Sequence, residues 1–183
     1  TLLKSDHFPG CHMEHMKPKI EGAPNYRKVE GFPVNGVGQP TVDGIRSVLN
    51  ILQRGGSDGD PTADHYGCDG PPSVLWLNMR EEPVLYINSR PFVLRNMDKP
   101  FNNVEYTGIS IDRIEQLERR LKDDVLKEAS QHNNKILLHD ETPAGVETVW
   151  EDIRPDTVLT INEVYEKLSH EEGYDVQYFR VPI

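Results

Sequence analysis

Apolar residues recur at helical spacing in three stretches of the chain. Residues 41–52 place an apolar side chain on one side at every turn, and residues 110–131 do so for longer, with Ser110 as the expected N-cap. A third helix is predicted from Thr160, because Thr160 and Glu163 form the T-x-x-E pattern of a capping box, and Gly173 marks its end. The mixed charges of "ERRLKDD" (118–124) predict a solvated outer face of the second helix.

Between the helices lie apolar runs of strand length. "SVLWLN" (73–78) is continuously apolar, which predicts a strand buried on both faces at the centre of a sheet. "VLYI" and "PFVL", separated by "NSR", predict a hairpin, "KILLHDE" (135–141) a second buried strand with "VETVWEDI" as its possible partner, and "YDVQYFRVPI" a last strand. Strands alternating with helices over 73–183 need crossover connections, which predicts an α/β fold with a central, mostly parallel sheet flanked by helices.

The remaining segments are rich in Gly and Pro. Residues 1–40 predict short extended pieces joined by turns, and residues 54–72 a long loop that is an insertion or mobile. The length of 183 residues fits one domain, 1–183, with the α/β part at 73–183.

Composition narrows the function classes. The net charge of -10 argues against general binding to nucleic acid or to anionic membranes. No apolar run reaches the roughly 20 residues of a membrane span, and two cysteines are too few for a disulfide scaffold. We therefore expect a cytoplasmic protein.

Charged residues follow two of the predicted strands. Arg80, Glu81 and Glu82 follow "SVLWLN", and "HDE" (139–141) ends the second buried strand. If the two strands are neighbours in a parallel sheet, both clusters lie at the edge where α/β proteins bind ligands. Arg80 is then the best contact for a phosphate or carboxylate, because its planar guanidinium offers several donors. The alternative is that both clusters are ordinary strand ends in water.

The cysteines and histidines give no strong catalytic or metal signal. Cys11 with two nearby histidines in "CHMEH" could ligate zinc, but no second knuckle completes a four-ligand set, so surface histidines are the preferred interpretation. A phosphate-cradling cysteine needs an arginine six residues later. Lys17 stands six residues after Cys11, and Val74 six residues after Cys68. We predict no metal, no cofactor and no catalytic residue in this chain.

Several segments together resemble the paladin family, cytosolic proteins related to cysteine-dependent, tyrosine-phosphatase-like inositol polyphosphate phosphatases (phytases). They are "LLKSDHFPGC", "IEGAPNYRKV", "GVGQPTVDGIRSVLN", "VLWLNMREEPVLYINSRPFVLR", "EYTGIS", "KILLHDE" and "YFRVPI", in the family's order. The resemblance implies a cysteine-phosphatase-like fold. In that family the segment like "YFRVPI" precedes a general-acid aspartate and, further on, the Cys-x5-Arg loop. Since the chain contains neither, we expect a single phosphatase-like domain that is incomplete at the C-terminus and lacks its catalytic segment.

The resemblance also implies a substrate site. Arg80 in "NMREE" matches an arginine expected to contact a substrate phosphate, with Glu81 or Glu82 orienting its guanidinium, and Asp6 and His7 match the family's "SDHF" beside the active-site region.

The implied function is part of a phosphatase that acts on phosphate monoesters of inositol polyphosphates or phosphotyrosine, with this chain alone inactive. Its partners would be a phosphorylated small molecule or phosphoprotein, and the remaining part of the same protein or further phosphatase-like units. The alternative is a non-catalytic module that binds phosphorylated ligands or a protein partner.

Overall fold

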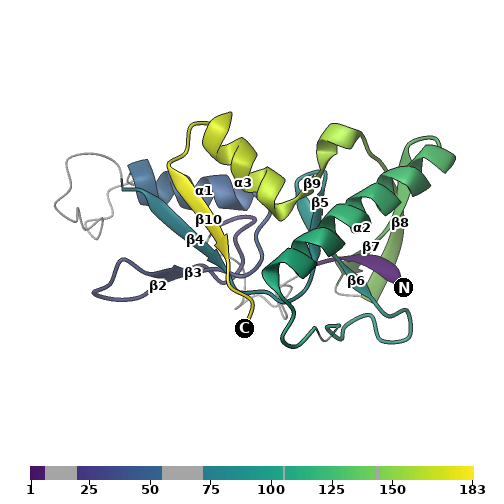
Figure 1. Cartoon of the computed structure of the whole chain (residues 1–183), viewed down its shortest axis with the longest axis horizontal. Coiled ribbons are helices and arrows are strands. Elements are labelled where there is room, and N and C mark those ends of the chain that lie inside the picture. The colour runs from purple at the N-terminus through teal and green to yellow at the C-terminus, as the bar shows by residue number, and fades with distance from the viewer. Residues whose placement is uncertain (7–19, 55–71, 105, 143–144) are drawn as a thin grey trace.

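The computed structural model of the chain describes residues 1–6, 20–54, 72–104, 106–142 and 145–183. Its main sheet has six strands in the order β8-β7-β1-β6-β5-β9 (Figure 1). The strands are β1 (Leu2–Ser5), β5 (Val84–Ile87), β6 (Arg90–Arg95), β7 (Lys135–Thr142), β8 (Gly145–Asp152) and β9 (Val158–Thr160). Two smaller sheets pair β4 (Val74–Asn78) with β10 (Val176–Arg180), and β2 (Arg27–Lys28) with β3 (Asn35–Gly36).

The three predicted helices are present. They are α1 (Val42–Arg54), α2 (Ile111–Gln131) and α3 (Ile161–His170), and a short 3-10 turn covers Pro155–Thr157. The capping box of α3 is confirmed, because the Thr160 N–H donates to Glu163 Oε2 at 2.8 Å and the Glu163 N–H to Thr160 Oγ1 at 3.4 Å. Ser110 is the N-cap residue of α2, as predicted, although its side chain makes no capping hydrogen bond.

The core lies on both faces of the main sheet. Leu85 and Ile87 of β5 pack in a cluster with Val125 of α2, whereas Val84 and Tyr86 pack in a second cluster with side chains of α1 and α3. Because alternate residues of a strand point to opposite faces, α2 covers one face and α1 with α3 the other (Figure 1). A central sheet flanked by helices, in the mixed α/β class, is therefore confirmed.

The prediction of a mostly parallel sheet is wrong for the six-stranded sheet. Of its five pairings only β1 with β7 is parallel. A short turn joins β5 to β6, and strands joined in a hairpin are necessarily antiparallel. This turn holds Asn88 and Ser89 at φ 48° and 68°, the left-handed conformation that a two-residue hairpin turn requires.

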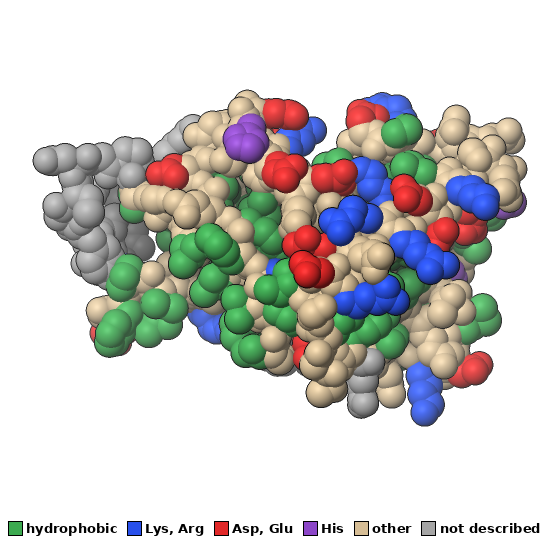
Figure 2. Space-filling model, in the orientation of Figure 1, with side chains coloured by type: hydrophobic (Ala, Val, Ile, Leu, Met, Phe, Trp, Pro, Cys, Tyr) green, Lys and Arg blue, Asp and Glu red, His purple; other side chains and the backbone are tan. Residues whose placement is uncertain are grey.

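Within residues 73–183, β4 and β10 form a parallel pair, which needs the predicted crossover connection, with Leu77 opposite Phe179 and Asn78 opposite Arg180. The sequence placed β4 at the centre of a sheet with both faces buried, and this is wrong among the described residues. Leu75 and Leu77 are 59% and 52% exposed, and Phe179 is 52% exposed. Figure 2 shows hydrophobic side chains gathered over β4, β10 and the β2–β3 hairpin. One face of the parallel pair is therefore open and apolar.

Candidate functional site

Arg80 lies two residues beyond the end of β4 and is held from two sides by carboxylates. Its Nη1 is 2.8 Å from Asp6 Oδ2, and its Nη2 donates to Glu82 Oε2. The contact with Asp6 is an ion pair without a hydrogen bond, and Arg80 Nε has no hydrogen-bond partner among the described residues. The Arg80 side chain is 29% exposed, so its guanidinium is fixed yet reachable from solvent.

The main chain at this point is anchored by Asn78. The Arg80 N–H donates to Asn78 Oδ1 at 3.0 Å, and Asn78 Nδ2 donates to the Tyr178 hydroxyl at 2.9 Å. Asn78 therefore ties the end of β4 both to the next residues of the chain and to β10. Asn78 was not among the predicted site residues, although a polar residue at the end of an apolar strand indicated a possible site position.

Glu82 holds a second arginine. Arg95 Nη1 donates to Glu82 Oε1 at 2.8 Å and the Val104 N–H donates to the same oxygen at 2.9 Å, while Arg95 Nη2 donates to Asn103 Oδ1 at 2.9 Å. Arg95 and Glu82 are both buried. Glu82 is therefore fixed by Arg95 and the Val104 N–H, and in turn it holds the Arg80 guanidinium in position.

The other predicted site residues lie differently. Glu81 accepts a hydrogen bond from the Gly108 N–H at 3.1 Å, so Glu82 rather than Glu81 orients the Arg80 guanidinium. Asp6 reaches Arg80 from the end of β1, and its side chain is 7% exposed. Burial raises the pKa of Asp6 above its ordinary 3.8, against the nearby guanidiniums of Arg80 and Arg95, which lower it. His7 lies outside the described residues.

The second charged cluster, at 139–141, does not join this site. β7, which carries it, lies in the six-stranded sheet, whereas β4 lies in the two-stranded one, so the premise of neighbouring strands is wrong. Asp140 instead accepts two hydrogen bonds from Arg90 Nη1, Glu141 pairs with Lys4, and His139 Nδ1 lies 3.3 Å from the Leu3 carbonyl oxygen. These side chains brace β7 against its neighbours.

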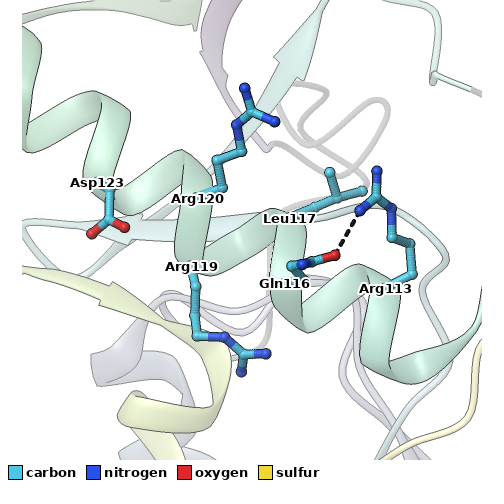
Figure 3. A pocket seen from close by; sticks show the side chains of 6 residues that line it. All are labelled: Arg113, Gln116, Leu117, Arg119, Arg120 and Asp123. Carbon is cyan, nitrogen blue, oxygen red and sulfur yellow. Dashed lines mark hydrogen bonds between the residues drawn. The ribbon is translucent and has the colours of Figure 1, made fainter.

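The charged run of α2 is solvated in part. A shallow hollow of about 270 Å³ on this helix is lined by Arg113, Gln116, Leu117, Arg119, Arg120 and Asp123. Figure 3 shows Arg119 pointing away from the side taken by Arg113 and Arg120, and the only hydrogen bond drawn among these residues joins Arg113 to Gln116. Side chains that diverge in this way do not converge on a ligand, as the alternating charges predicted.

Glu118 of the same run is an exception that the sequence analysis missed. Arg180 Nη2 donates to Glu118 Oε1 at 2.7 Å, the Val84 N–H donates to the same oxygen at 3.0 Å, and both charged side chains are 1% exposed. Burial raises the pKa of Glu118 above its ordinary 4.5, and Arg180 opposes that rise. The position of Glu118 on the stripe that includes Ile114, Leu121 and Val125 was the available signal.

No cluster of three metal-ligating side chains is found among the described residues, and Cys11 with its neighbouring histidines lies outside them. Nor does any helix in this part of the chain have the length and apolarity to cross a membrane.

Comparison with known proteins decides the family. The family model of the PTP-like phytases, whose description reads "Inositol hexakisphosphate", matches residues 77–183. The chain belongs to the PTP-like phytase family. That match begins in β4, includes Arg80, and runs through β10.

The curated relatives of this PTP-like phytase family member are much longer proteins. Paladin from Homo sapiens is 30% identical over 134 residues, which are 70% of this chain and 13% of that protein. Paladin from Xenopus tropicalis is 26% identical over 160 residues, which are 87% of this chain and 16% of that protein. The chain therefore spans less than a fifth of the curated relatives it matches.

A solved structure supports the fold. The tandemly repeated protein tyrosine phosphatase like phytase from Mitsuokella multacida aligns with the whole of this chain, over 28% of its own length, at a TM-score of 0.55 and 14% identity. At that identity the likeness concerns the fold.

Proposed function

We propose that this chain supplies the phosphate-binding part of a phosphatase-like unit whose ligand is a phosphate monoester of an inositol polyphosphate or of phosphotyrosine. The observation that carries the proposal is Arg80, a partly exposed arginine just beyond the carboxyl end of a strand of the parallel pair. Ligands of α/β proteins bind beyond the carboxyl ends of parallel strands. Membership of a family described by inositol hexakisphosphate supports the choice of ligand class.

The geometry around Arg80 suits a site prepared for an anion. Arginine binds phosphate through parallel N–H donors, and Asp6 with Glu82 holds the guanidinium in one orientation before a ligand arrives. The exposed part of the guanidinium is what a phosphate oxygen would contact, because the unpartnered Nε–H is itself buried. In this proposal Glu81 lies at the border of the site, and His7, which is outside the described residues, stays a candidate on the sequence alone.

Catalysis is proposed for a larger assembly. Residues 1–183 would form one phosphatase-like domain without the nucleophilic loop, since neither cysteine is followed by an arginine at the sixth position. The nucleophile and general acid would come from the remaining part of the same protein or from further phosphatase-like units in the cytoplasm. The exposed apolar face of β4–β10 supports this, because parallel sheets are normally covered on both faces.

The test is binding of inositol hexakisphosphate to the 183-residue protein, measured by isothermal titration calorimetry. Arg80→Gln should weaken binding by about tenfold or more, the loss of a charge-assisted contact. Arg90→Gln is the matched control, because Arg90 is also partly exposed and pairs with two carboxylates, Asp140 and Glu151, and it should change affinity less than about twofold. Absence of binding, or equal losses in both variants, would contradict the proposal.

A second candidate is a non-catalytic module that binds the same ligands. It is favoured by Arg80 being held by two carboxylates inside a chain without a Cys-x5-Arg motif. Comparing the intact mass of the native protein with 20.9 kDa, and then assaying phosphate release, distinguishes the two. A larger protein that releases phosphate supports the phosphatase, whereas binding without release supports the module.

A further inference from the structure

A groove of about 410 Å³ is lined by residues of β10, α3 and the first turns of α2. Tyr178, Phe179 and Arg180, three consecutive residues of β10, all line it. Since successive side chains of a strand point to opposite faces, a groove lined by three in a row borders the edge of the strand. Among the described residues β10 pairs only with β4, on its other side. The outer edge of β10 therefore faces the groove.

That edge presents unpaired main-chain groups. The Val181 N–H donates to the Asn78 carbonyl at 2.8 Å and the Asp175 carbonyl accepts from the Val74 N–H at 2.9 Å, so odd-numbered residues of this segment face β4. In a parallel ladder the residues between them direct their N–H and C=O groups the other way. Tyr178 and Arg180 therefore offer main-chain donors and acceptors to the groove.

Two side chains in the same groove also lack partners. Arg180 uses Nη2 for Glu118, but its Nε and Nη1 have no hydrogen-bond partner in the described structure, and its side chain is 1% exposed. Asn162 Oδ1 of α3 is likewise buried without a partner. A buried polar group without a partner is unfavourable, so it favours a ligand that supplies one. Glu118 balances the charge of Arg180, and Tyr178 interacts with its guanidinium. The unpartnered Asn162 Oδ1 favours a ligand that supplies an N–H group.

The rim of the groove is acidic. Glu115 of α2 and Glu166 of α3 line it, and Figure 2 shows acidic side chains between α3 and the beginning of α2. The chain as a whole carries a net charge of -10. A ligand with basic side chains is therefore attracted and one with acidic side chains repelled.

We propose that this groove binds an extended polypeptide segment of another protein, which adds as a strand to the outer edge of β10 and carries lysine or arginine toward Glu115 and Glu166. An extended main chain alternates carbonyl and N–H groups, and so it can supply the N–H group that Asn162 lacks. Arg80 does not line this groove, so the proposal does not rest on phosphate binding.

The test uses two fluorescein-labelled octapeptides with the full 183-residue protein, one alternating Val and Lys and one alternating Val and Glu, followed by fluorescence anisotropy. The Lys peptide should bind saturably and the Glu peptide about tenfold more weakly or less. Asn162→Ala should weaken binding of the Lys peptide about fivefold, the loss of one hydrogen bond, without lowering the Tm of the free protein. Glu166→Lys should also weaken it, whereas the control Glu128→Lys, on an exposed part of α2 outside the groove, should not.

Amide hydrogen exchange locates the bound peptide. On addition of the Lys peptide, exchange of the Tyr178 and Arg180 amides should slow, while that of Phe179, which faces β4, should stay unchanged. No saturation up to on the order of 1 mM, or equal affinity for both peptides with no effect of either substitution, would overturn the proposal. Protection of the same amides that rises with protein concentration without peptide would also overturn it, because a second copy would then occupy the edge.

Discussion

Removal of Glu118 should unfold much of the protein. Glu118→Ala leaves the Arg180 guanidinium buried without a counter-charge, which costs about 3–5 kcal/mol for a pair that is 1% exposed on both sides. It also leaves the Val84 N–H without its acceptor at 3.0 Å, which costs about 1–3 kcal/mol. Together the two losses amount to about 4–8 kcal/mol, comparable with the roughly 5–15 kcal/mol that stabilises a typical domain.

Urea denaturation followed by far-UV circular dichroism measures this loss. Glu115→Ala is the matched control on the same helix, because its contact with Arg119 is a partly exposed pair at 3.7 Å and should contribute less than about 1 kcal/mol. The double variant Glu118→Leu with Arg180→Met removes both charges and should regain most of the stability, apart from the Val84 amide. A Glu118→Ala variant that loses less than about 1 kcal/mol, or a double variant no more stable than the single one, would refute the reasoning.

Three further outcomes are expected. Burial raises the pKa of Asp6, so the stability that Asp6 contributes is complete below its unfolded pKa of 3.8 and is lost as the pH rises through its folded pKa. Asp6→Asn should therefore flatten this part of the plot of Tm against pH. Identical plots for the two proteins would count against the effect. The exposed apolar face of β4–β10 should make the 183-residue protein self-associate, and Phe179→Lys should reduce that association in sedimentation velocity. An unchanged distribution of sedimentation coefficients would exclude this face as the contact. Gly44→Ala should lower the Tm, because the added Cβ would lie 2.0 Å from the Gly22 carbonyl oxygen. Such overpacking costs about 1–3 kcal/mol of the free energy of unfolding, which outweighs the preference of alanine for helices. A raised Tm would contradict this.

Local patterns predicted the elements well. The spacing of apolar residues located α1, α2 and α3, and the two-residue turn at Asn88 and Ser89 joins the strands that the sequence assigned to a hairpin. These features depend on residues a few positions apart, which a sequence shows directly.

Strand pairing was less predictable. β1, four residues at the beginning of the chain, pairs with β6 and β7, far away in sequence, and so sits inside the main sheet. "VLYI" became the strand buried on both faces, whereas "SVLWLN" became the strand with an exposed apolar face. Both runs are continuously apolar, so their composition does not distinguish which one lies at the centre. The choice depends on which distant segments pack against each run.

The candidate site shows the same division between local and distant information. Arg80 lies two residues beyond β4 and Arg180 is the last residue of β10, the partner of β4 in the parallel pair, with Asn78 opposite Arg180 in the register. Yet Arg180 meets Glu118 of α2 and is fully buried, whereas Arg80 meets Asp6 and Glu82 and stays 29% exposed.

A bulky anion can therefore reach Arg80, while Arg180 can serve only a ligand that enters the groove beside β10. Two arginines that look equivalent in the sequence thus belong to two different sites. It follows that Arg80→Gln should leave binding of the Lys peptide unchanged, and that Asn162→Ala should leave binding of inositol hexakisphosphate unchanged. If either substitution weakened binding of both ligands, the two arginines would have to share one site. Their different burial would then not separate two sites.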